Sequence, residues 1–467
     1  MPITEVFQFD TDEGINLIKA ILYNQGFQLY QEIWTDQPPL FTVILAFFLK
    51  NGQNCVIIAR LLVLGFATLL VWTFTQLLRQ TVGEIYAVIG AVLLVISINF
   101  LRFSVSVMIG LPSVALALLS VYFLFCFYKH KKTYFTTLSG LALAASLQVK
   151  MFTLFLVPLI AFYWLTVGKI SKTRSLLWWP FFQWLANLGL GYLLISLLLN
   201  ALQFEQFFNF HVQDNLQDKF VNEHSLQDVI ALYLQGIDTV FLSIAGLGLI
   251  RYKLQPAKMS QKLLQFPLVW LVLVTVLLVN HKPIWYHHYL LLSIPLTWLA
   301  TAGIKVAVRQ YEKQQIRLQW RQRNWGKIIP RKMAAIALLF TLLVTPIKLS
   351  LIHLQNQQFI QQSTVHWQIL ETVKQHQANT HWLFTDLPIY GVYADLKIPP
   401  EIATFSRKRV AAGKVTPDFI FSVVEKYQPE QYILSRFPSV KAPLNPYLQA
   451  NFTKIHDQEQ IQHYVQK

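Results

Sequence analysis

The sequence predicts a polytopic α-helical membrane protein with about ten or eleven transmembrane helices and a small C-terminal extracytoplasmic α/β domain. Apolar residues make up 54% of the 467 residues and charged residues only 13%, whereas a soluble domain carries about 25% charged residues. The apolar residues fall in long blocks, and a helix needs about 20 such residues to cross the hydrocarbon core. The blocks lack the alternation of barrel strands, so the spans must be helices, which bond their backbone groups internally.

Ten apolar segments are candidate spans. They lie near residues 56–78, 84–100, 110–128, 135–149, 151–167, 176–202, 229–250, 264–280, 286–305 and 334–353. The two segments on either side of Lys150 are short and weakly separated. The domain organisation predicted from them is a first loop with interfacial helices (1–55), a helix bundle (56–353) and an α/β domain (354–467).

The basic residues between the spans predict the orientation. Alternate loops are rich in them: Arg79; Lys129, Lys131 and Lys132; Lys169, Lys172 and Arg174; Arg251, Lys253, Lys258 and Lys262; and eight between residues 306 and 332. The intervening loops hold one each, at Arg102, Lys150, Lys219 and Lys282. Because lysine and arginine gather in cytoplasmic loops, the first loop and the C-terminal domain are expected outside the plasma (bacterial inner) membrane. We then also expect a further helix upstream of Met1.

The net charge of +16 does not predict nucleic-acid binding. The basic residues sit at the bilayer edges, where they orient helices and attract anionic membrane lipids. Two cysteines, Cys55 and Cys126, exclude a disulfide framework. The C-terminal domain has no glycine-rich fingerprint, so no nucleotide cofactor is expected.

The first loop contains two short helical patterns. Asp10-Thr11-Asp12-Glu13 opens the first, and Gly26 is a natural stop for it. Its apolar stripe suits a position in the membrane interface. The prolines of Asp36-Gln37-Pro38-Pro39 make a rigid corner before the apolar run 40–49. Acidic residues in a first helical turn often only stabilise the helix, but here two acidic clusters are held together at the bilayer surface.

The C-terminal residues predict a small domain of mixed helices and strands. Residues 382–386 and 431–435 are strand-like, and residues 416–427 form a helical pattern with proline at its first position. We interpret this domain as a lid or an acceptor-docking module.

Several motifs of the first loop carry a family resemblance. They are Phe9-Asp10-Thr11-Asp12-Glu13-Gly14, Leu29-Tyr30-Gln31-Glu32-Ile33-Trp34, Asp36-Gln37-Pro38-Pro39-Leu40 and Ala59-Arg60-Leu61. Together they resemble the first extracytoplasmic loop of the GT-C glycosyltransferases. The resemblance is closest to the bacterial branch with the aminoarabinose–lipid A transferases and the protein O-mannosyltransferases. In outline it covers the whole chain.

The resemblance implies an inverting transfer of a sugar from a polyprenyl-phosphate donor to a hydroxyl acceptor on the extracytoplasmic face. An acceptor hydroxyl needs a carboxylate base, and the family's acidic pair falls on Asp12 and Glu13, with Asp12 as the base. The family also implies a divalent metal ion in some members. Its ligands here would be Asp36 and, from a later loop, His211.

The leaving phosphate needs positive charge where its own charge develops. The family often has a lysine where this chain has Gln37, and many relatives have an aspartate near residues 108–112, where it has none. Either Arg60, Lys282 or a metal ion compensates for the missing lysine, or the donor differs. We expect Arg60, Lys282, Tyr286 and His287 to bind the donor phosphate. Arg60 and Tyr286 can also be explained without a role in the site. An arginine near a span end can extend its charged group to the membrane interface, and a tyrosine can belong to the aromatic belt at that interface.

A transporter or flippase of a lipid-linked or amphiphilic substrate is the alternative function. Such proteins often have internal repeats with interrupted spans at matched positions, and this sequence shows no such symmetry. A polymerase or ligase of lipid-linked glycans is closer in chemistry. The sequence names neither the sugar nor the acceptor.

Overall fold

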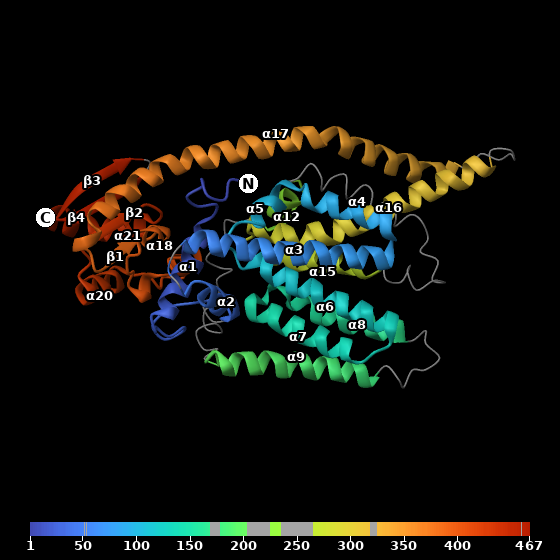
Figure 1. Cartoon of the computed structure of the whole chain (residues 1–467), viewed down its shortest axis with the longest axis horizontal. Coiled ribbons are helices and arrows are strands. Elements are labelled where there is room, and N and C mark those ends of the chain that lie inside the picture. The colour runs from blue at the N-terminus through green and yellow to red at the C-terminus, as the bar shows by residue number, and fades with distance from the viewer. Residues whose placement is uncertain are drawn as a thin grey trace.

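The computed structural model describes residues 1–50, 52, 54–168, 178–202, 225–234, 265–317, 325–458 and 460–467. A bundle of roughly parallel helices forms most of the molecule, and a smaller α/β domain lies at one end of it (Figure 1). The first loop lies between the two parts, so residues distant in sequence meet at this end of the bundle.

Each helix of the bundle overlaps a predicted span, and the bounds of some agree to within a few residues. They are α3 (Cys55–Thr81), α4 (Glu84–Val95), α6 (Gly110–His130), α7 (Tyr134–Val149), α8 (Leu156–Gly168), α9 (Trp178–Leu198), α15 (Gln265–Val279), α16 (Tyr289–Arg317) and α17 (Trp325–Gln375). Within the described residues, α3, α6 and α9 are long and apolar enough to cross a membrane alone. The polytopic helical fold is therefore confirmed.

Five predicted spans differ from the structure in detail. Helix α16 continues to Arg317, beyond the predicted end at residue 305, and α17 extends beyond both ends of the predicted span 334–353. The second predicted span is divided into α4 and a short helix α5 (Ile98–Phe103). The fifth begins as a short 3-10 helix η1 (Met151–Phe155) before α8. Most of the seventh lies outside the described residues, which include α12 (Ser225–Leu234) at its start.

Helix α6 lies deep in the bundle and packs on α7 through small polar residues. The Ser120 and Ser139 hydroxyl oxygens are 3.0 Å apart, and the Ser113 hydroxyl donates to the Ser146 carbonyl at 3.1 Å. Gly140 brings α7 against α9, because a Cβ there would lie 2.6 Å from the Trp184 carbonyl oxygen. Small residues and interhelical hydrogen bonds are the usual means of helix packing in membranes.

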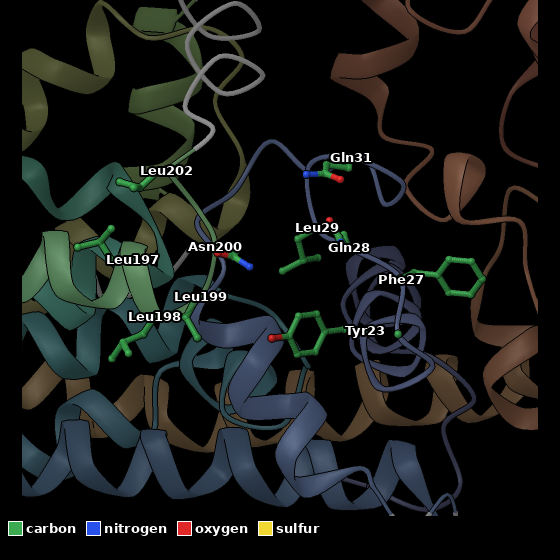
Figure 2. A pocket seen from close by; sticks show the side chains of 11 residues that line it. Tyr23, Phe27, Gln28, Leu29, Gln31, Leu197, Leu198, Leu199, Asn200 and Leu202 are labelled. Atoms are coloured by element: carbon green, nitrogen blue, oxygen red, sulfur yellow. The ribbon is translucent and has the colours of Figure 1, made fainter.

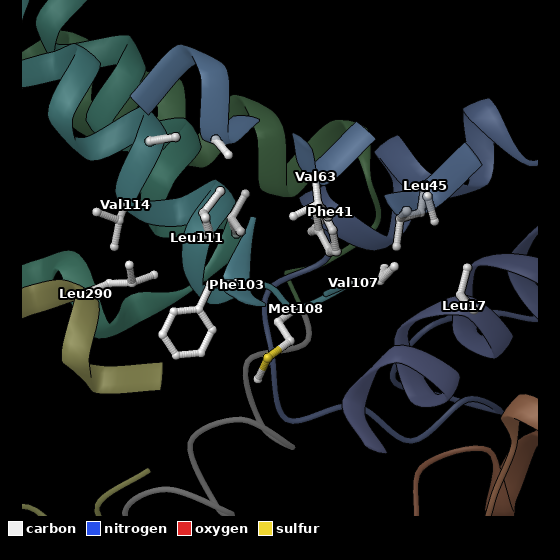
Figure 3. Close-up of a cluster of buried hydrophobic side chains, with 14 of the residues drawn as sticks. Leu17, Phe41, Leu45, Val63, Phe103, Val107, Met108, Leu111, Val114 and Leu290 are labelled. Carbon is white, nitrogen blue, oxygen red and sulfur yellow. The ribbon is translucent and has the colours of Figure 1, made fainter. Parts of the chain in front are cut away.

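The apolar core continues from the bundle into the first loop. Leu111 and Val114 of α6 and Leu290 of α16 line one part of the cluster, which continues through Val107 to Leu17 of the first loop (Figure 3). The outer end of the bundle is thus a packed surface that positions the loop.

Helix α1 (Thr11–Asn24) lies inside the protein, whereas the sequence suggested a position in the membrane interface. Its residues 13–20 and Leu22 are all buried. It packs on α2 (Leu40–Phe48) and on α18 (Ile389–Ala394) of the C-terminal domain. Gly14 permits this contact, because a Cβ there would lie 2.6 Å from the Ile389 nitrogen. The apolar stripe is covered by protein instead of lipid.

The C-terminal domain has a four-stranded sheet of order β1-β2-β4-β3. Strands β1 (Leu383–Thr385) and β2 (Gln431–Leu434) are parallel, as βαβ topology requires, and β3 (Phe452–Gln458) and β4 (Ile461–Gln466) complete the sheet antiparallel to their neighbours. The helices are α18, α19 (Arg407–Ala411), α20 (Pro417–Tyr427) and α21 (Pro438–Asn451). Both predicted strands and the predicted helix with its N-terminal proline are confirmed.

Helix α17 joins the bundle to the C-terminal domain without a break. It runs for 51 residues and forms the long upper edge of the molecule (Figure 1). The boundary placed at residues 353 and 354 therefore falls within one continuous helix.

Candidate active site

A cavity of about 620 Å³ lies where the first loop, the bundle and the C-terminal domain meet. Its polar lining residues come from all three parts: Asp10, Thr11, Asp12, Asn16, Lys19, Asp36, Gln37, Lys150, His281, Tyr286, His287, His288, Thr404, Ser406, Arg407, Lys408 and Arg436. Of the eight residues predicted for the site, Asp12, Asp36, Tyr286 and His287 line this cavity.

Helix α1 presents one polar face to the cavity. Asp12, Asn16 and Lys19 are four and three residues apart, so they project from the same side of the helix. Asp10 is the N-cap, and its Oδ1 accepts a hydrogen bond of 2.9 Å from the Asp12 backbone nitrogen. Asp10 Oδ2 accepts a hydrogen bond from the Tyr286 hydroxyl. These contacts hold the start of α1 against the bundle.

The Asp12 carboxylate has no hydrogen-bond partner within the described part of the chain. Burial and the neighbouring Asp10 raise its pKa to about 6, and the cations Lys150, Arg436 and Lys19 oppose this rise. A carboxylate with a pKa near 6 is ionised at neutral pH, yet it is a stronger base than an ordinary aspartate. Asp12 thus has the exposure to the cavity and the proton affinity of a general base.

Glu13 points away from the cavity, into the protein. It is fully buried and forms an ion pair with Arg60, whose Nη2 lies 2.9 Å from Glu13 Oε2. The backbone nitrogens of Phe9 and Val107 donate to the same carboxylate at 2.7 and 3.0 Å. Two adjacent acidic residues therefore have different environments, because they project from different faces of α1.

Arg60 is buried with Glu13 and is not part of the cavity lining. Its guanidinium also donates to the carbonyl oxygens of Ile3, Val6 and Phe7, and it lies 4.7 Å from the centre of the Phe9 ring. All three guanidinium nitrogens have partners. Arg60 fastens the N-terminal segment to α3 and has no donor directed at the cavity.

Lys150 lies at the junction of α7 and η1 and points to the residues that start α16. Its Nζ is 2.9 Å from His287 Nε2 and 4.9 Å from the centre of the Phe152 ring. Burial lowers the pKa of Lys150 to about 8, although Asp12 and Asp36 favour its charged form. The ammonium ion is the donor in this contact, so His287 accepts with a neutral imidazole nitrogen.

Of the two residues predicted to bind a metal ion, only Asp36 lies among the described residues. Asp36 lines the cavity and accepts a 3.0 Å hydrogen bond from Gln37 Nε2, whereas His211 lies outside the described residues. Among the residues that are described, no three histidine, cysteine, aspartate or glutamate side chains gather as a metal site. These residues do not fit a metal ion by themselves, and no step is assigned to one.

Lys282 does not line the cavity, whereas its neighbour His281 does. Five cations in the lining were not assigned from the sequence: Lys19, Lys150, Arg407, Lys408 and Arg436. The spacing from Asp12 to Lys19 on one helical face was a usable signal, and so was the basic run Arg407-Lys408-Arg409. Lys150 was predicted to lie between two spans, without a role in the site.

A second cavity of about 620 Å³ lies between the first loop and the end of α9. Tyr23 and Leu29 of the loop face Leu199 and Asn200, which follow α9 (Figure 2). Among the described residues that line it, Tyr23 alone is titratable. The first cavity is therefore the candidate for chemistry.

The structure was compared with known proteins. No family model matches the chain, and no curated protein sequence matches it. Solved structures do match. ArnT from Cupriavidus metallidurans bound to undecaprenyl phosphate has a TM-score of 0.66 at 13% identity, over 99% of this chain and 95% of that one. The apo state of the same protein has a TM-score of 0.64 at 14% identity, over 97% and 93%.

A more distant match is the oligosaccharyltransferase of Archaeoglobus fulgidus in complex with Zn and sulfate. Its TM-score is 0.51 at 12% identity, over 90% of this chain and 63% of that one. At such low identities the similarity concerns the fold. The fold implied by the resemblance in the first loop is confirmed at that level: the chain has the fold of ArnT and of the archaeal oligosaccharyltransferase.

Proposed function

We propose that this protein is a membrane glycosyltransferase that moves a sugar from a polyprenyl-phosphate donor to a hydroxyl acceptor on the extracytoplasmic face. The observation that carries the proposal is one unpaired carboxylate, Asp12, in a cavity that also contains Lys19 and Lys150. The ArnT structure with a similar fold contains undecaprenyl phosphate, which supports a lipid-phosphate donor here.

Asp12 acts as the general base in the proposed reaction. It accepts the proton of the acceptor hydroxyl while the hydroxyl oxygen attacks the anomeric carbon of the sugar. The bond from that carbon to the donor phosphate oxygen breaks in the same displacement, so the configuration inverts. The proton leaves Asp12 readily afterwards, because a pKa of about 6 favours ionisation at neutral pH.

Lys19 and Lys150 stabilise the leaving polyprenyl phosphate. Both ammonium groups are held in the cavity lining, and a charge aimed at a developing phosphate charge needs no reorganisation during the reaction. The sequence predicts this role for Arg60 and Lys282, but neither residue lines the cavity. The contact with His287 fixes the position of the Lys150 ammonium in the cavity lining.

The first experiment is a transfer assay with the full chain in nanodiscs and radiolabelled polyprenyl-phosphate sugars. We expect labelled sugar to move to an acceptor hydroxyl, with formation of free polyprenyl phosphate. The same assay with a chelator added tests whether sugar transfer depends on a metal ion near Asp36. Transbilayer movement of an intact lipid-linked sugar, without cleavage of its phosphate bond, would support the flippase instead and contradict this proposal.

The pH dependence of kcat/KM is expected to be bell-shaped. Asp12 must be ionised to act as a base, so the rate should rise with pH through about 6. Lys150 must be charged to bind phosphate, so the rate should fall as pH rises through about 8. In Lys150→Arg the alkaline fall should move to higher pH, because a guanidinium stays charged. An alkaline limb that does not move in this variant would contradict the assignment of Lys150.

A further inference from the structure

Two aspartates at the start of α1 line the same cavity, but other groups hold only one of them. Asp10 Oδ1 accepts a hydrogen bond of 2.9 Å from the Asp12 backbone nitrogen, and Asp10 Oδ2 accepts one from the Tyr286 hydroxyl. Two carboxylates in one cavity repel each other, so a proton taken up by the pair is shared unequally. Groups that bind only one of the two carboxylates therefore bear on where that proton goes.

Arg102 of α5 adds a positive charge on the side of Asp10. Its Nη2 lies 3.6 Å from Asp10 Oδ2 and donates to the Phe9 carbonyl oxygen at 2.8 Å. Its guanidinium also contacts two rings, with 4.6 Å to the centre of Tyr286 and 5.2 Å to the centre of Phe359 in α17. These contacts fix the guanidinium, so its charge stays beside Asp10.

The Tyr286 hydroxyl donates its proton to Asp10. A hydroxyl has one proton to give, and the Met108 sulfur, 3.4 Å from the same oxygen, is a weak acceptor. The Tyr286 ring is stacked on Phe103, with ring centres 5.3 Å apart. A hydroxyl donor and a guanidinium both favour the ionised form of the carboxylate that they contact. Of the two aspartates, Asp10 is thus the one that is stabilised as an anion.

The charge of Asp10 acts on Asp12 against the cations of the cavity. Burial and then Asp10 raise the pKa of Asp12 to about 6. The cations that interact with Asp12 are Lys19, Lys150, Lys408 and Arg436. The other charged or titratable groups in the described lining, besides Tyr286, are Asp36, His281, His287, His288 and Arg407. All of these groups stay in place when Asp10 or its partners are changed.

We propose that Tyr286 and Arg102 keep Asp10 ionised, so that its fixed negative charge makes Asp12 the carboxylate that takes the proton of the acceptor hydroxyl. The inference rests on the proposed function, in which Asp12 is the base. Asp10 is then a positioning residue, because it acts on the reaction through Asp12. Tyr286 serves Asp10 in this arrangement, whereas the sequence suggested that it binds the donor phosphate.

Carbodiimide labelling of the full chain in nanodiscs tests the place of the proton without turnover. A water-soluble carbodiimide adds to a carboxyl group only when it is protonated, and peptide mass spectrometry reads the extent of labelling at each aspartate. In the unaltered protein we expect Asp12 to be labelled in preference to Asp10, with a midpoint near pH 6. In Asp10→Asn the helix cap is kept, and the midpoint at Asp12 should fall toward the 3.8 of an ordinary aspartate.

Two further variants leave Asp10 in place and remove one of its partners. In Tyr286→Phe and in Arg102→Gln we expect labelling to move from Asp12 to Asp10. A hydrogen bond to a charged group contributes about 1.5–3 kcal/mol, so the ratio of Asp10 to Asp12 labelling should rise about 10- to 150-fold in Tyr286→Phe. The affinity of Tyr286→Phe for polyprenyl phosphate should change less than about two-fold.

Matched controls and the pH profile complete the test. Tyr134→Phe and Asp418→Asn change an exposed tyrosine of α7 and an exposed aspartate of α20, and both should be labelled as the unaltered protein is. For the unaltered protein, kcat/KM at pH 5 should be about a tenth of its value at pH 7, because a base with a pKa of about 6 is largely protonated at pH 5. In Asp10→Asn this ratio should rise toward one.

An unchanged Asp12 midpoint in Asp10→Asn would overturn the inference. A Tyr286→Phe variant that is still labelled at Asp12 and has lost affinity for polyprenyl phosphate would overturn it as well, because Tyr286 would then bind the donor. If the labelling changes as expected while no sugar transfer is found, the arrangement of charges stands and the proposed glycosyltransferase function fails.

Discussion

Turnover is expected to fall by about 10²–10⁴-fold when Asp12 is replaced by asparagine, because general-base assistance is typically worth that much. Asparagine keeps the shape of the side chain and removes its basicity. The acid limb of the pH profile should disappear together with the activity, because the group that titrates near pH 6 is then absent. Initial rates in nanodiscs across pH 5 to 9 measure both effects.

Donor binding separates this role from a structural one. Asp12→Asn should still bind polyprenyl phosphate, since the carboxylate repels the phosphate. Asp418→Asn is a suitable control, because Asp418 is an exposed acidic residue in the first turn of another helix, α20. Near-normal turnover in Asp12→Asn would place the base elsewhere, and Asp36 in the same cavity would be the next candidate.

Glu13→Gln is expected to lower the stability of the protein instead of its chemistry. The Glu13–Arg60 ion pair is buried, with side chains 0% and 1% exposed. Removal of one partner leaves a buried charge without compensation, which typically costs about 3–5 kcal/mol. We expect a lower yield of folded protein and a lower midpoint of thermal unfolding in detergent.

A double variant distinguishes the two possible roles of Glu13. Glu13→Gln combined with Arg60→Gln removes both charges, so it should recover part of the stability lost in Glu13→Gln. Arg60→Gln alone should be as destabilising as Glu13→Gln alone. If Glu13→Gln unfolds like the unaltered protein and yet has lost its turnover, Glu13 acts in the chemistry, as the family resemblance first implied.

The bundle could be predicted because bilayer spans impose a length and composition on each helix. The capping pattern of Asp10 to Glu13 likewise predicted the start of α1, where Asp10 is the observed N-cap. Local signals of this kind act within a few residues. Strands β3 and β4 were missed because their residues, 452–458 and 461–466, mix polar and apolar side chains without a clear alternation.

The site was only partly predictable because its geometry depends on contacts between distant residues. Asp12 and Glu13 are adjacent, but Glu13 meets Arg60, 47 residues later, and Asp12 is left facing the cavity. The place of Lys408 and Arg436 in the lining depends on how the C-terminal domain sits on the first loop. No periodicity in the sequence reports that arrangement.

Because α17 is unbroken, its number of residues sets the orientation of the C-terminal domain relative to the bundle. The helix leaves the bundle and reaches Gln375 beside the sheet without a hinge. Each residue of an α-helix adds about 1.5 Å of rise and about 100° of rotation. One residue more or fewer in its exposed middle would turn the C-terminal domain by more than a quarter of a circle relative to α3 and α6. The length of α17 thus sets the angle at which the C-terminal domain presents Lys408 to the cavity that also contains Asp12.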